Sequence, residues 1–219
     1  ADIKPFTDAL PFEMTGAQKR AVREILADMS SEKLMNRIVT GDVGSGKTAV
    51  AEAAADAKVK AGYRVCVMVP TGILAHQHYE DFSRVFSKLG IRCALLTGST
   101  SKKEKAEIMS SLDDSSVIET DIVIGTHALL TEGVNIARLG LAVIDEQHRF
   151  GVMQRAALFE KTDDVHSLVM SATPIPRTLT LAAYGSIDVS RIDELPAGRQ
   201  TIDTFVVDES YRDRLNGFI

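Results

Sequence analysis

Short runs of apolar residues alternate with longer stretches of helical periodicity along this chain. Continuous runs of Val, Ile and Leu are typical of parallel strands that are covered on both faces of a sheet. The runs predict buried strands at 37–40, 64–70, 92–98, 121–126, 141–145 and 167–173. A further pair of strands, at 188–193 and 204–208, is expected to close the same sheet.

The segments between these runs carry the spacing of amphipathic helices. Two of the predicted helices begin with a capping box, Thr15 to Gln18 and Ser101 to Glu104, in which paired side chains satisfy free backbone donors. Strand and helix alternate regularly, which predicts an α/β fold with an open, mostly parallel sheet and helices on both faces. The helices are predicted at 16–29, 47–61, 73–88, 102–112, 152–160 and 176–183.

A single domain is expected to contain nearly all of the chain, over residues 1–207. The end of the chain, 208–219, has the pattern of a new helix, with Tyr211, Leu215 and Phe218 on one side. That helix has no obvious place in the preceding sheet. We therefore expect 208–219 to be the start of a linker or of a second, truncated domain.

One stretch between the first strand and the following helix carries a recognisable chemistry. It contains Gly-x-x-x-x-Gly-Lys-Thr, the spacing of a phosphate-binding loop, with an apolar strand before it and an alanine-rich helix after it. The residues predicted to bind a nucleotide here are Gly41, Asp42, Val43, Gly44, Ser45, Gly46, Lys47 and Thr48. The glycines let backbone N–H groups turn toward phosphate oxygens, and the helix N-terminus adds a positive dipole.

Two side chains of this loop have distinct expected roles. Lys47 would reach the β- and γ-phosphates, and the Thr48 hydroxyl would bind Mg²⁺. The alternative is a glycine-rich turn that carries an exposed lysine.

A second acidic element follows the buried run at 141–145. Asp145 comes directly after four apolar residues and is predicted to hold Mg²⁺, and Glu146 beside it is predicted to polarise the attacking water as a general base. The alternative is that both carboxylates end the strand in solvent.

The preferred base is predicted to be adenine. The chain has no Asn-Lys-x-Asp sequence, which is the usual guanine-reading element of GTPases. Gln18 is a candidate to hydrogen-bond the adenine, and Phe12 or Phe6 to pack on it. The capping box already explains Gln18, so both interpretations of this residue stay open.

Composition limits the remaining functions. The chain has 219 residues with a formal net charge of −5, so it lacks the basic excess that is usual in nucleic-acid binders, and any such contact must come from local groups. The two cysteines, Cys66 and Cys93, are interpreted as free buried thiols of a protein in the cytoplasm. No apolar stretch approaches the length of a membrane span, so we expect no membrane partner.

Five segments of the chain resemble the RecG family of ATP-dependent DNA helicases, which belongs to superfamily 2. The resemblance is collinear over nearly the whole chain and corresponds to the first of two RecA-like motor domains in that family. It implies a RecA-like P-loop NTPase fold, with ATP and Mg²⁺ as cofactors. The segments are "LPFEMTGAQKRAV", "MNRIVTGDVGSGKTAVA", "DEQHRFGVMQR" (145–155), "SATPIPRTLTLAAYG" (171–185) and "IDELPAGR" (192–199).

The resemblance also implies roles for individual residues. Lys47, Thr48, Asp145 and Glu146 match the ATP and Mg²⁺ residues argued above. Gln147 and His148 complete a DExH-type motif, in which the histidine is expected to link the nucleotide site to the "SAT" segment. The residues expected to contact DNA or to couple the ATP state to DNA binding are Thr71, Thr126, His127, Ser171 and Thr173.

Small hydroxyl residues and helix N-termini suit contacts to DNA phosphates that do not read bases. Family members commonly carry an acidic residue where this chain has Gly72, and we expect no loss of function from that difference. Two histidines nearby, His76 and His78, are interpreted as surface residues of the helix predicted at 73–88. Arg149 and Phe150 are expected either to pack at the end of the acidic strand or to touch DNA, and both interpretations stay open, whereas Arg177 is interpreted as a residue of a first helical turn.

The partners implied by the resemblance are branched or forked DNA, a second RecA-like domain and a DNA-gripping wedge domain. The parent protein would remodel stalled replication forks in repair and recombination, while this chain alone would bind nucleotide and hydrolyse it slowly. One alternative is the motor of Mfd, the translocase of transcription-coupled repair, which shares "HRFGV" and "TPIPRT", although Gln147 and "DELPAGR" favour RecG. Another is a P-loop module that binds ATP without hydrolysing it.

Overall fold

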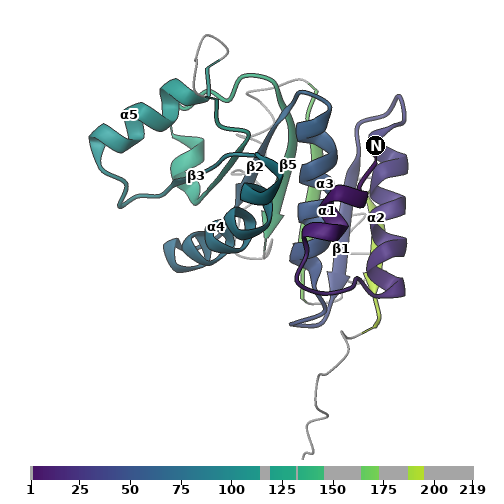
Figure 1. The fold of residues 1–219 in the computed structure, drawn as a ribbon. Helices are drawn as coiled ribbons and strands as arrows, with labels where there is room; N and C mark the ends of the chain where they lie inside the picture. Colours follow the sequence, from purple (N-terminus) through teal and green to yellow (C-terminus); the bar gives the residue numbers. More distant parts are fainter. Residues whose placement is uncertain (1, 114–118, 132, 146–163, 173–186, 195–219) are drawn as a thin grey trace, which may run out of the picture.

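The computed structural model describes the fold of this chain outside a few segments (Figure 1). The residues that it describes are 2–113, 119–131, 133–145, 164–172 and 187–194. The helices predicted at 152–160 and 176–183, the strand predicted at 204–208 and the terminal helix predicted at 208–219 therefore lie outside the described residues.

Seven parallel strands form one open sheet in the order β3-β4-β2-β5-β6-β1-β7. This confirms the predicted parallel α/β sheet, and each described strand overlaps a predicted run. The strands are β1 (Asn36–Gly41), β2 (Arg64–Met68), β3 (Cys93–Leu96), β4 (Ile122–Gly125), β5 (Leu139–Asp145), β6 (His166–Ser171) and β7 (Asp188–Ile192). All their carboxyl ends lie at the same edge of the sheet, since every pair is parallel.

The helices agree with the predicted pattern, with small differences at their ends. Helix α2 has the predicted bounds. Helix α4 begins one residue earlier and ends two residues earlier than predicted. The helices are α1 (Lys4–Ala9), α2 (Gly16–Met29), α3 (Lys47–Lys60), α4 (Gly72–Phe86) and α5 (Lys102–Ser111), with short 3₁₀ turns η1 (Ser87–Leu89) and η2 (His127–Leu130). The pattern missed α1, a six-residue helix with proline in its first turn.

The sheet divides the core into two layers, because successive strand residues point to opposite faces. Val65 and Val67 pack with helices α1 to α4 on one face, whereas Cys66 between them packs on the other. On the second face, the described part of the core is completed by residues around η2 and the segment that follows it, including Leu129, Val134 and Ile136. Figure 1 shows α3 and α4 in front of the strands.

Helix α3 is packed closely between the sheet and its neighbouring helices. Six of its nine buried residues are alanine, namely Ala49, Ala51, Ala53, Ala54, Ala55 and Ala57. Alanine has the highest intrinsic helix propensity and a small side chain, so the helix axis can approach its neighbours. The first residue of this helix is Lys47, so its tight packing also fixes the start of the helix that the loop leads into.

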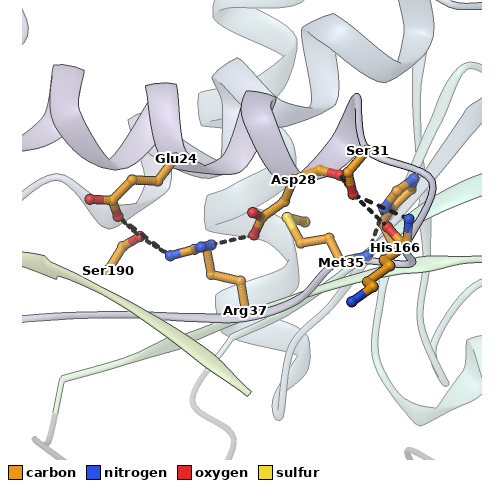
Figure 2. A network of polar contacts seen from close by, with 8 residues as sticks. Glu24, Asp28, Ser31, Met35, Arg37, His166 and Ser190 are labelled. Atoms are coloured by element: carbon orange, nitrogen blue, oxygen red, sulfur yellow. Dashed lines mark hydrogen bonds and ion pairs between the residues drawn. The ribbon is translucent and has the colours of Figure 1, made fainter. Parts of the chain in front are cut away.

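A polar network fastens strand β1 to its surroundings (Figure 2). Arg37 is buried; its Nε donates to Asp28 of α2 over 2.7 Å, and its Nη1 donates to the Ser190 hydroxyl of β7 over 2.9 Å. Ser190 also donates to Glu24 of α2. Charged groups at this depth are stable only when they are paired and hydrogen-bonded. The network therefore holds β1, β7 and α2 in one arrangement.

The two cysteines are free thiols, as predicted, but only Cys66 is buried and Cys93 is half-buried. Burial raises the pKa of the Cys66 thiol to about 12. Within the described part of the chain, none of the helices is long and apolar enough to pass through a bilayer.

Candidate nucleotide-binding site

The phosphate-binding loop connects the carboxyl end of β1 to the first residue of α3. Gly44 and Gly46 have φ angles of 79° and 81°. Glycine adopts this left-handed region without the steric cost that a Cβ imposes. Gly46 is also the N-cap of α3, so the loop delivers the chain directly to a helix N-terminus, which is a favourable place for phosphate.

Neighbouring groups enclose the loop so closely that two of its glycines have no room for a side chain. A Cβ on Gly41 would lie 2.6 Å from the Ser45 hydroxyl and 2.9 Å from the carbonyl oxygen of Ile192 in β7. A Cβ on Gly46 would overlap the side-chain amide of Gln18. The glycines predicted from the loop spacing therefore have a packing reason as well as a conformational one.

Gln18 caps α2 and also supports the loop. Its Oε1 accepts from the Thr15 backbone over 2.9 Å, which completes the predicted capping box. Its Nε2 donates to the Ser45 carbonyl over 2.7 Å, a contact that sequence reasoning missed because the partners are 27 residues apart. Both ends of the buried amide are thus engaged, while recognition of adenine by Gln18 stays a prediction.

The lysine of the loop lies across the loop itself. The Lys47 ammonium donates to the carbonyl oxygens of Gly41 over 2.7 Å and of Asp42 over 3.0 Å. Thr48 follows it in the first turn of α3, and Val43 at the tip of the loop is 73% exposed. Lys47 and Thr48 are therefore next to each other at the helix start, where the predicted phosphate and metal contacts require them.

Asp145 ends β5 at the same edge of the sheet as the loop. Met170 of β6 is paired with Asp145 on one side and with Val39 of β1 on the other, so Asp145 lies level with the last residues of β1 before the loop. Carboxylate and hydroxyl oxygens are the ligand types that Mg²⁺ prefers. The carboxylate oxygens of Asp145 and the hydroxyl oxygen of Thr48 therefore suit a magnesium ion as ligands, and both residues lie at the same edge of the sheet. Glu146 and His148 lie outside the described residues.

His78 corrects one sequence prediction. It was expected at the surface, but its side chain is 8% exposed, and its Nε2 lies 2.8 Å from Oδ2 of Asp145. His76 on the same helix is exposed, as predicted. Helical spacing contained the missing signal, because Ala75, His78 and Phe82 repeat at intervals of three and four residues and form the buried side of α4.

A hollow of ≈ 210 Å³ adjoins the loop on its outer side. Phe12, which is 47% exposed, forms one wall, and the start of α3 with Thr48 and Glu52 forms another. Asp81 and Arg84 of α4 also line it. An aromatic ring beside a phosphate-binding loop offers a stacking surface for a base, so Phe12 remains the candidate for the adenine contact that this hollow favours.

Glu52 is a buried carboxyl group beside that hollow, only 4% exposed. Its pKa is raised to about 8, mainly by burial and further by the charge of Asp81, whereas Arg84 acts in the opposite direction. In the unfolded chain the pKa of this group is near 4.5. The folded chain therefore binds this proton more tightly than the unfolded chain does, and stability falls as the pH rises from about 4.5 to about 8.

We expect Glu52→Gln to remove this loss of stability. The melting temperature of the variant relative to the wild type should rise between pH 5 and pH 8 and then level off. A difference of several degrees is expected, at roughly 2–4 °C per kcal/mol for a chain of this size. Thermal melts over this pH range test it, with exposed Glu80→Gln of α4 as the control. A constant difference at every pH would contradict the buried acid.

The residues expected to contact DNA also lie at the carboxyl edge of the sheet, in the half away from the phosphate-binding loop. Thr71 follows β2 and caps α4 by accepting from the Leu74 backbone over 3.3 Å. Thr126 follows the adjacent strand β4 and is buried, while His127 next to it is exposed. The structure thus brings Thr71, Thr126 and His127 to neighbouring strand ends, separated from the loop by β5 and β6.

Ser171 lies between the two halves, at the end of β6. It is buried and paired with Thr40, which directly precedes the loop. This place suits a residue that couples the nucleotide to the DNA side, although that role stays a prediction, and Thr173 lies outside the described residues.

Two acidic residues at the end of β7 also contact the site, and sequence reasoning assigned them no role. Asp193 pairs with Arg20 of α2 over 2.8 Å, and Glu194 accepts from the Ala17 backbone over 3.1 Å. Both contacts lie at the first turns of α2, next to Gln18. They join the end of β7 to the helix that supports the loop.

Known proteins share both the sequence and the fold of this chain. The family model of DEAD/DEAH box helicases matches residues 15–182. The ATP-dependent DNA helicase RecG of Thermotoga maritima is 54% identical over 202 residues, which is 92% of this chain and 26% of the relative. RecG of Bacillus subtilis is 48% identical over 218 residues, which is 100% of this chain and 32% of the relative. The chain spans about a quarter to a third of the length of these relatives.

Solved structures agree with these relatives. A structure of RecG bound to a three-way DNA junction has a TM-score of 0.82 and 48% identity, covering 97% of this chain and 28% of that one. The DEAD-box helicase Mss116 bound to ssRNA has a TM-score of 0.70 at 19% identity, covering 88% of this chain and 43% of that one, and shows the fold alone. The predicted RecA-like fold is confirmed. The matched family model covers both the loop and Asp145, and the chain accordingly belongs to the DEAD/DEAH box helicase family, as a RecG-like motor domain.

Proposed function

We propose that this chain is the ATP-binding motor domain of a DNA helicase that remodels branched DNA and stalled replication forks. The observation that carries the proposal is the arrangement of the sheet edge. A glycine-rich loop supported by Gln18 lies at one half of this edge, Asp145 ends a strand that only β6 separates from the loop, and hydroxyl residues end the strands of the other half. The likeness over 97% of the chain to RecG in a structure with a three-way DNA junction supports the choice of DNA.

The residues of the site have separable tasks in this proposal. Loop N–H groups and Lys47 hold the phosphates, and Phe12 packs on the base. Thr48 and Asp145 would hold Mg²⁺, which neutralises phosphate charge when it is bound. Glu146 is proposed to orient and polarise the attacking water.

The proposal predicts weak DNA binding with little sequence preference, because phosphate contacts position a protein without reading bases. About three or four phosphate contacts would lower the affinity for duplex DNA roughly 40- to 150-fold between 50 and 200 mM salt. Fluorescence anisotropy with a labelled three-way junction and two duplexes of unrelated sequence measures this. His127→Ala should weaken all three complexes alike, with exposed His76→Ala as the control. A salt-insensitive or sequence-selective complex would argue against the proposal.

A further inference from the structure

His78 places a ring N–H on the carboxylate that the site offers to magnesium. Its Nε2 lies 2.8 Å from Oδ2 of Asp145, and both side chains are largely buried. An ionised carboxylate only accepts hydrogen bonds, so Nε2 carries the hydrogen and donates it. The other ring nitrogen, Nδ1, is buried and has no hydrogen-bond partner among the described residues. The single polar contact of this ring in the described structure is therefore the one to Asp145.

Packing fixes the position of the imidazole ring. Its edge meets the Phe82 ring at a centroid distance of 6.3 Å and an angle of 65°. Phe82 in turn packs on Phe86 at 5.6 Å, and Phe86 on Phe6 of α1 at 6.1 Å. Because Phe82 and Phe86 are fully buried, the ring has little freedom to turn. The donor that faces Asp145 is thus held by a row of aromatic side chains.

The sheet explains why these two residues meet. Strand β2 leads through Thr71 into α4, and β2 is paired with β5, with Met68 opposite Ile144. The end of β5 with Asp145 therefore lies beside the start of α4. Residue 78 lies two turns into that helix, about 10 Å along its axis from Thr71. His78 therefore reaches the Asp145 carboxylate from α4, the helix that follows Thr71 on the DNA side of the sheet edge.

We propose that His78 is a positioning residue that orients the Asp145 carboxylate for Mg²⁺, an inference that rests on the proposed nucleotide site. A carboxylate on a single bond turns freely unless one of its oxygens is held. The N–H on Oδ2 fixes that rotation, so the carboxylate is presented to the metal in one orientation before the metal arrives. Partners that orient metal ligands in this way contribute about 10- to 100-fold in metal affinity or activity.

The experiment measures the contribution of the metal to nucleotide binding instead of turnover. Calorimetry gives the Kd of the ATP analogue AMP-PNP for the 219-residue chain in Mg²⁺ and in EDTA. The Kd in EDTA divided by the Kd in Mg²⁺ is the metal contribution. His78→Phe keeps an aromatic ring against Phe82 and removes the donor. We expect it to lower the ratio about 10-fold or more, toward one, and to leave the Kd in EDTA unchanged. His76→Phe, on the exposed side of the same helix, should match the wild type.

Restoring the donor should restore the metal contribution. His78→Gln places an amide nitrogen at about the same distance along the side chain as Nε2, and should recover most of the ratio. His78→Leu repeats the test with a smaller apolar side chain, so that a poorly folded phenylalanine variant does not decide the outcome. An unchanged ratio in both apolar variants, or an equal loss of affinity in Mg²⁺ and EDTA, would overturn the role of His78. If Lys47→Ala bound AMP-PNP as tightly as the wild type does, the proposed nucleotide site itself would be overturned.

Discussion

ADP is expected to stabilise the wild-type chain against heat and to leave Lys47→Ala unaffected. Lys47 is the cation of the loop, and the contacts described for its ammonium group are to backbone carbonyls of Gly41 and Asp42. Truncation would remove the predicted phosphate contact together with these two hydrogen bonds, while the glycines, Gln18 and the packing of α3 continue to shape the loop. The expected result is a loss of binding in a chain that still folds.

The size of the effect follows from mass action. A ligand at 100 times its Kd stabilises the folded state by about 2.7 kcal/mol, which corresponds to a shift of roughly 5–10 °C for a chain of this length. Differential scanning fluorimetry with and without Mg·ADP measures it. Lys103→Ala, an exposed lysine of α5, is the matched control and should keep the full shift. Equal shifts in wild type and Lys47→Ala would place nucleotide binding elsewhere.

The second expected result is a separation of binding from hydrolysis. The RecG resemblance implies that a second motor domain contributes an arginine to the charge that develops on the γ-phosphate. An arginine of this kind contributes about 10³–10⁵ in rate in P-loop enzymes. From a typical turnover of ~10 s⁻¹, residues 1–219 alone should hydrolyse ATP at roughly 10⁻² to 10⁻⁴ s⁻¹. DNA should accelerate this little.

The test is a steady-state ATPase assay with and without forked DNA. Full-length RecG of Bacillus subtilis, which matches this chain over 218 residues, provides the reference. Slow hydrolysis by the chain beside fast, DNA-stimulated hydrolysis by the reference would agree with the prediction. Fast and DNA-stimulated hydrolysis by residues 1–219 would show that these residues complete the site without help.

Much of the fold was predictable because a short, continuous apolar run between helical segments is compatible with few structures other than a buried strand. All seven described strands overlap predicted segments; six follow apolar runs, and β7 lies in the additional segment predicted at 188–193, while the capping box located the start of α2. The edge position of Asp145 followed from the same reasoning, since an acidic residue after a parallel strand lies at the carboxyl edge. The helix α1 was missed because six residues are too few for a periodic pattern.

The contacts that tie the site together were not predictable from local pattern. The bond from Gln18 to Ser45 and the bond from His78 to Asp145 join residues 27 and 67 positions apart. A capping glutamine and a histidine among polar neighbours already have sufficient local explanations. Only the order of the strands shows that α4 passes close to the end of β5, and that order follows from the packing of the whole sheet.

The double use of Gln18 decides how base selectivity has to be measured. Removing this side chain would loosen the start of α2 and the Ser45 carbonyl together, so affinity for every nucleotide would fall through loss of loop support. That common loss divides out when the affinities of the same variant for ADP and GDP are compared. The ratio of the affinities for ADP and GDP is therefore the quantity that isolates adenine recognition by Gln18. The affinity for one nucleotide reports mainly on how well Gln18 supports the loop.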